Sequence, residues 1–126
     1  MKFVLDRAAY DHMVKHPSGE VGRYLTKQAA QLSAYAKIQA GVDTGALKHS
    51  INYKLTRSSM GLVALVGSDN RVALMHHQGT RPHIIMPKTA KTLRFYSRGR
   101  IVYAQVVRHP GTKPNKYLTD NLRRVI

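Results

Sequence analysis

Two short segments in the second half of this chain have nearly the same sequence. His77-Gln78-Gly79-Thr80-Arg81-Pro82 recurs as His109-Pro110-Gly111-Thr112-Lys113-Pro114. In such a pattern the glycine supplies a positive φ, the threonine hydroxyl bonds to the nearby backbone, and the proline stiffens the exit of the turn. The pattern predicts that each copy is a corner where the chain enters or leaves a set of strands. We expect the upstream chain to support those strands.

The residues between the two corners have the composition of strands. Residues 83–87, 93–97 and 101–107 are rich in β-branched and aromatic residues, and prolines bound the first of them. Arg98-Gly99-Arg100 supplies a turn between the second and the third. The sequence therefore predicts an antiparallel hairpin over residues 93–107.

The first 41 residues have a helical pattern. Asp6 is a candidate N-cap for a helix over residues 7–15, Pro17 ends that helix, and Ser18 is a candidate cap for a longer one that reaches about Ala40. Gly41 then closes it. The longer helix carries one stripe at spacings of three and four, formed by Val21, Leu25, Gln28, Ala29, Leu32, Ala36 and Gln39.

The pattern changes after residue 42. A turn over residues 43–45 leads into a brief helical turn, with Asp43 or Thr44 as its cap. Residues 51–56 alternate between apolar and polar, and residues 62–67 are apolar throughout, so both predict strands. We favour a short helix over residues 72–77, and a C-terminal helix that starts at Asn115 or Thr119. Taken together, residues 1–126 predict one α+β domain, with N-terminal helices, one of them long, packed on a small antiparallel β-sheet, and a short C-terminal helix.

The chain is strongly basic. It holds 21 Lys and Arg against six Asp and Glu, a net charge of +15, and after residue 43 the acids are only Asp69 and Asp120. Such a surface attracts polyanions or an acidic protein, and salt weakens the contact. The alternative is a basic face that only keeps the protein soluble. Without cysteine or a signal peptide the sequence predicts folding in a cytoplasm, and no apolar run is long enough to span a membrane.

The residue types in this chain give little support for a catalytic function. Six scattered acids do not suit a two-metal nuclease, and the spacing of His76, His77, His83 and His109 matches no compact zinc motif. A histidine pair with Lys or Tyr can still cleave RNA without a metal. We therefore predict no catalytic, metal or cofactor site, and keep a metal-independent ribonuclease as an alternative.

Binding of anions or nucleic acid is a further alternative. The two corners bring glycine, threonine and a cation together as in a phosphate cradle, but neither copy continues as a P-loop. In residues 93–100, arginine alternates with aromatic residues. That pattern suits base stacking and equally suits a strand with Phe95 inward and Arg94 and Tyr96 outward.

The order of the motifs resembles one family. A helix followed by residues 42–51, a hairpin that ends at Val66-Gly67-Ser68, then Gly79-Thr80, and a closing segment 114–118 before a terminal helix is similar to the tail-completion proteins of long-tailed phages. These proteins are also called neck, head-to-tail connector or minor tail component proteins. Residues 77–85, 93–95 and 107–114 resemble the variants found in phages of actinobacteria.

The resemblance implies a structural virion subunit and no catalysis. It implies an α+β subunit that forms a ring, with six copies expected, between a neighbouring neck or stopper ring and the tail terminator or tail tube, while genomic DNA passes through the channel. Where many members have Glu-Phe-Gly-Thr, this chain has His77-Gln78-Gly79-Thr80, so a salt bridge made by that acid is not expected here.

The charged corners and the hairpin turn are the candidate contacts with a neighbouring subunit or ring. The expected interface residues are His77, Gly79, Thr80, Arg81, Pro82, Arg98, Arg100, His109, Gly111, Thr112, Lys113 and Pro114. Basic loops around Arg57, Lys88 and Lys91 belong to the same hypothesis, with an acidic ring or DNA as partner. The alternative function is a small basic nucleic-acid-binding protein or a metal-independent ribonuclease.

Overall fold

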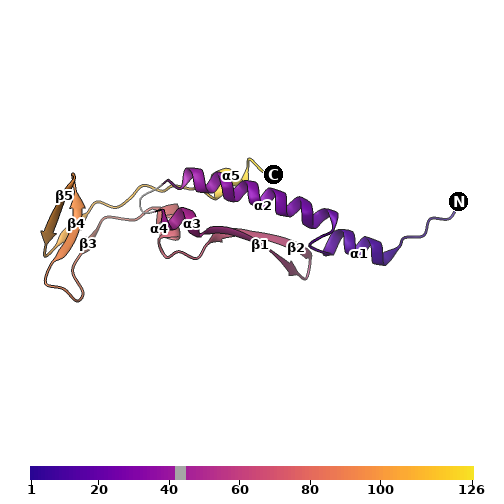
Figure 1. Cartoon of the computed structure of the whole chain (residues 1–126), viewed down its shortest axis with the longest axis horizontal. Coiled ribbons are helices and arrows are strands. Elements are labelled where there is room, and N and C mark those ends of the chain that lie inside the picture. Colours follow the sequence, from indigo (N-terminus) through magenta and orange to yellow (C-terminus); the bar gives the residue numbers. More distant parts are fainter. Residues whose placement is uncertain (42–44) are drawn as a thin grey trace.

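The computed structural model describes residues 1–41 and 45–126, and its fold is α+β. The molecule is elongated: the N-terminus lies at one end, and the hairpin of β4 (Leu93–Ser97) and β5 (Arg100–Ala104) lies at the other (Figure 1). Among the described helices, none is long and apolar enough to cross a lipid bilayer.

Two helices form the N-terminal half, as the sequence predicts. In α1 (Arg7–Lys15), the backbone N–H of Ala9 donates to Asp6 Oδ1 at 3.1 Å, which confirms the predicted cap. In α2 (Glu20–Gln39) the cap is Gly19, so the prediction of Ser18 was wrong. The reason is local: Ser18 Oγ lies 2.7 Å from His16 Nδ1, and this contact holds Ser18 in the turn before the helix.

The long helix packs on a hairpin made of β1 (Ile51–Ser58) and β2 (Gly61–Ser68). The two strands pair antiparallel over their whole length. α3 (Ala46–Ser50) leads into β1; the predicted caps Asp43 and Thr44 lie outside the described residues. Gly41 has φ 71° directly after the C-cap Ala40, as predicted for the end of α2.

The core is small and lies where α2 meets the start of β1 and the C-terminal segment. Its buried residues are Ala36, Ala40, Ile51 and Tyr117, with Leu47 and Leu118 packed around them. Alanines on α2 let the neighbouring segments approach its backbone closely. α4 (Val72–Gln78) confirms the short helix predicted there and contributes the buried Ala73, while α5 (Thr119–Leu122) is a single turn.

Within residues 1–41 and 45–126, the strands form three separate two-stranded sheets. β1 pairs with β2, β4 with β5, and β3 (His83–Ile85) with β6 (Val107–His109). The expectation that the upstream chain supports the strands between the two corners was therefore wrong, because α2 packs on β1 and β2 instead. The strand expected over residues 101–107 is also interrupted, since at Gln105 and Val106 the chain changes partner from β4 to β3.

Candidate functional site

The two repeated segments are hydrogen-bonded to each other. The N–H of Thr80 donates to the carbonyl of Thr112 and the N–H of Thr112 donates to the carbonyl of Thr80, each at 3.1 Å. The two hydroxyls lie 3.1 Å apart, and Thr112 N–H also reaches Thr80 Oγ1 at 3.1 Å. We call this pairing the crossing, and the chain that it closes off, residues 80–113, the arm.

Glycine is required on both sides of the crossing. Gly79 has φ 74° and Gly111 has φ 86°, a region that residues with a side chain rarely adopt. A Cβ on Gly79 would run into the carbonyl of Thr112, and a Cβ on Gly111 would run into the carbonyl of Thr80. The repeated Gly-Thr pairs therefore let two backbones approach closely.

A stacked pair of histidines follows the crossing. His83 lies opposite His109 in the β3–β6 ladder, with ring centroids 4.9 Å apart and the planes 30° from parallel. His83 Nδ1 donates to the carbonyl of Arg81 at 2.9 Å, while His109 Nδ1 accepts from the N–H of Gly111 at 3.0 Å. Both rings thus hold the backbone at the base of the arm.

The two histidines on α4 pack against the C-terminal segment. The rings of His76 and His77 lie on Tyr117, with centroids 5.7 Å and 5.4 Å away. Tyr117 is 1% exposed, its hydroxyl donates to the carbonyl of Ala73 at 3.5 Å, and burial raises its pKa above 10.0. His77 and His109, the pair on which a ribonuclease would depend, therefore pack against different partners.

Sequence reasoning missed a set of amide side chains that fix the C-terminal segment. Asn115 Nδ2 donates to the carbonyl of Gln39 at 2.9 Å and lies 3.1 Å from His76 Nε2. Asn121, 2% exposed, donates to Gln39 Oε1 at 2.6 Å and to the carbonyl of Tyr117 at 2.8 Å. The signal in the sequence was the place of Gln39 at the end of the mostly apolar stripe of α2.

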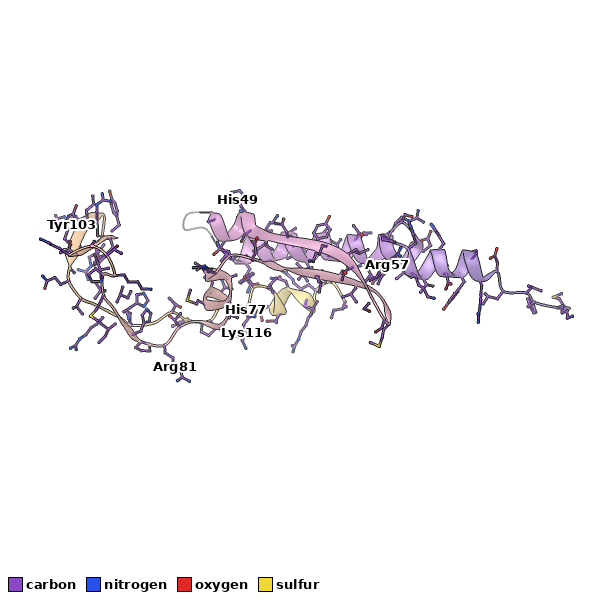
Figure 2. The ribbon with its side chains drawn as sticks, turned by 90° about the horizontal axis from the view of Figure 1, so that it is seen from below. His49, Arg57, His77, Arg81, Tyr103 and Lys116 are labelled. Carbon is purple, nitrogen blue, oxygen red and sulfur yellow. The ribbon has the colours of Figure 1, made fainter. Side chains whose placement is uncertain are left out.

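The predicted interface residues fall into two groups. Ten of them, from His77 to Pro82 and from His109 to Pro114, lie at or beside the crossing, whereas Arg98 and Arg100 lie at the turn of the β4–β5 hairpin. Figure 2 shows Arg81 beside the crossing and Tyr103 on the distant hairpin. The residues do not form one site; they mark the two ends of one arm.

The crossing is not built to hold an anion. The N–H groups of Thr80 and Thr112 are bonded to the opposite copy, and the N–H of Gly111 is bonded to His109, so these three donors of a phosphate cradle are already occupied. In the described part of the chain, no three His, Cys, Asp or Glu side chains gather where they could bind a metal ion. Beside these bonded groups, the exposed cations Arg81 and Lys113 flank the crossing.

Comparison with known proteins adds no relative. The sequence matches no protein family, and neither a curated protein nor a solved structure resembles the chain.

Proposed function

We propose that this chain is a structural subunit of a phage neck, which forms a ring that joins the DNA-filled head to the tail and lets DNA pass. No catalytic step belongs to this role. The observation that carries the proposal is the arm. Among the described elements, the strands of the arm pack mainly with each other, β3 with β6 and β4 with β5, while α1, α2, α3, α5, β1 and β2 pack together as the body.

An isolated two-stranded ladder is only marginally stable in water. Residues 80–113 consist of two such ladders in series, and they extend beyond the body (Figure 1). Exposed apolar side chains lie along the arm: Ile84, Met86, Tyr96, Ile101, Tyr103 and Val106. A segment of this kind gains order when it packs against another molecule, as an assembly subunit requires.

The other end of the molecule offers a different apolar surface. Phe3 and Val4 are 90% and 88% exposed ahead of α1, at the end of the molecule opposite to the β4–β5 hairpin (Figure 1). A subunit with unlike ends makes heterologous contacts, and such contacts close into a ring when the rotation between neighbours allows it. The elongated shape thus fits a ring subunit without fixing the number of copies.

The proposal predicts that purified protein, alone or mixed with neck and tail proteins, forms rings. Negative-stain imaging and mass photometry measure this directly. Reversing the arm charges with Arg98→Glu and Arg100→Glu should weaken the association of the subunit with DNA-filled heads by about tenfold or more. Arg7→Glu with Lys27→Glu, an equal charge change on exposed sites of the body, is the matched control.

Two results would contradict the proposal. One is association that both double variants leave unchanged. The other is a monomer that cuts RNA and loses the activity on His77→Ala or His109→Ala, which would make the ribonuclease alternative correct.

A further inference from the structure

The arm concentrates positive charge without any negative charge. It holds eight of the 21 Lys and Arg residues and none of the six Asp and Glu residues. All eight cations are exposed: Arg81, Lys88, Lys91, Arg94, Arg98, Arg100, Arg108 and Lys113. Both ion pairs found among the described residues lie on α1 and α2, so within that part of the chain the arm cations have no counter-ion.

The cations of the β4–β5 hairpin are distributed over both faces and the tip. Arg94 lies opposite Tyr103, and Tyr96 lies opposite Ile101, so these four side chains share one face. Arg100 lies opposite Ser97 on the other face. Arg98, with φ 50°, occupies the turn.

This distribution selects between two kinds of acidic partner. A flat acidic protein surface would require cations on one face of the hairpin. The major groove of B-DNA admits a two-stranded ribbon, and when such a ribbon enters tip first, its two faces turn toward the phosphates on the two walls of the groove. A ribbon with arginine on both faces and at its tip suits the groove better.

The uncharged part of the hairpin supports the same partner. Tyr96 is 73% exposed and Tyr103 is 64% exposed on the face that they share with Arg94. Phe95 and Val102, which face the other way, are half-buried. Exposed tyrosines between arginines supply flat surface for sugars and base edges while the arginines neutralise phosphates.

We propose that the arm binds duplex DNA, with the β4–β5 hairpin lying in a groove and its arginines on the flanking phosphates. This inference builds on the proposed function, because it names the part of the subunit that contacts the DNA. Since the contact is electrostatic, it does not depend on base sequence. Binding releases counterions condensed on the DNA, so added salt weakens the contact.

The test measures the binding of the full-length protein to a fluorescent duplex of about 20 base pairs by anisotropy, between about 50 and 300 mM NaCl. Arg94→Gln with Arg98→Gln and Arg100→Gln should raise the Kd by about tenfold or more at about 100 mM salt. The same variant should reduce the slope of log K against log salt by roughly 2 to 3, since each lost phosphate contact contributes about 0.9.

The matched control removes the same charge from the body. Arg7, Lys27 and Lys54 are exposed, and changing all three to Gln should alter the Kd by less than about threefold. Equal losses in the two triple variants would overturn the proposal, because binding would then follow net charge alone. Amide spectra of both variants verify that β4 still pairs with β5.

Two further readouts distinguish the partner and the location. Photo-cross-linking to a bromodeoxyuridine duplex should attach DNA to peptides from residues 91–108; attachment mainly to α1 or α2 would contradict the proposal. A polyglutamate competitor that displaces the duplex at equal charge concentration would also contradict it and would indicate an acidic protein partner. This assay contains no assembled ring and no other neck protein. DNA binding can therefore hold when the neck proposal fails, and it can fail when the neck proposal holds.

Discussion

At the scale of single residues, the crossing explains why one short pattern occurs twice. Thr80 and Thr112 exchange equivalent hydrogen bonds, and Gly79 and Gly111 turn the chain on equivalent sides of them. Because both passages of the chain meet the same local geometry, both need the same residue types. The repeat is thus a consequence of pairing in space.

Adding a side chain to either glycine should loosen the base of the arm. In Gly79→Ala or Gly111→Ala, the new Cβ collides with the opposite threonine carbonyl, and the positive φ costs about 1–3 kcal/mol more. Hydrogen exchange should show faster exchange of the Thr80 and Thr112 amides, while amides of α2 keep their protection. Gly67→Ala, where a Cβ meets nothing within 4 Å, is the control. Unchanged exchange at both threonines would show that the crossing does not need glycine.

At the scale of elements, α5 depends on contacts made by its neighbours. A single helical turn is not stable by itself, so it holds its place through the bonds of Asn121 and the burial of Tyr117. The C-terminal segment is thus fixed between α2 and α4, which also fixes the direction in which Pro114 leaves the crossing.

The burial of Tyr117 predicts a specific sensitivity to alkali. In the folded protein its pKa lies above 10.0, so above about pH 10 the unfolded chain loses a proton that the folded chain retains. The free energy of unfolding should therefore fall as pH rises through this range, and Tyr117→Phe should remove that part of the fall. Urea denaturation at about pH 8 and about pH 10.5 measures it.

The comparison needs a control because lysines also titrate in this range. Tyr103→Phe changes an exposed tyrosine and should behave as wild type at both pH values. At about pH 8, Tyr117→Phe should cost less than about 1 kcal/mol, since the lost bond to Ala73 is long at 3.5 Å. An equal pH dependence in wild type and Tyr117→Phe would contradict the assignment.

The sequence predicted the individual helices and strands better than it predicted which of them pair or pack together. The helix capped by Asp6, the stripe of α2 and the β4–β5 hairpin follow from local periodicity and turn residues, and all three are confirmed. Pairing of β3 with β6 joins residues far apart in the chain, and alternation of side chains does not indicate which strand lies alongside. The hydrogen bonds of Asn115 and Asn121 were missed, because the sequence of a polar segment does not show whether an amide side chain faces solvent or a backbone carbonyl.

At the scale of the whole molecule, the buried core and the arm are separate. Ala36, Ala40, Ile51 and Tyr117 all lie outside residues 80–113. The basic arm therefore contributes little to the stability of the body, and its sequence can satisfy a partner without disturbing the core. The same separation explains why the upstream chain does not support the strands between the two corners, contrary to the expectation from the sequence.

Removal of the arm should leave the body folded. Since His83 and His109 are directly paired, an Asn-Gly turn in place of residues 84–108 closes the chain as a tight hairpin. We expect the shortened protein to keep its helix signal in circular dichroism and a Tm within about 5 °C of wild type. It should lose DNA binding and ring formation. Unfolding or aggregation of the shortened protein would show that the arm supports the core.

The position of the crossing also predicts an order of folding for the arm. Thr80 and Thr112 are 32 residues apart, so joining them first would close a longer loop, at a greater entropic cost, than closing the hairpin turn. The turn at Arg98 and Gly99 joins neighbours and closes within microseconds, and each later pairing, first along β4–β5 and then along β3–β6, begins from a shorter loop. We therefore expect pairing to proceed from the tip of the arm toward the body. The bonds of the crossing, which orient the arm, should then form last, so that a nascent subunit acquires the length of its arm before its direction.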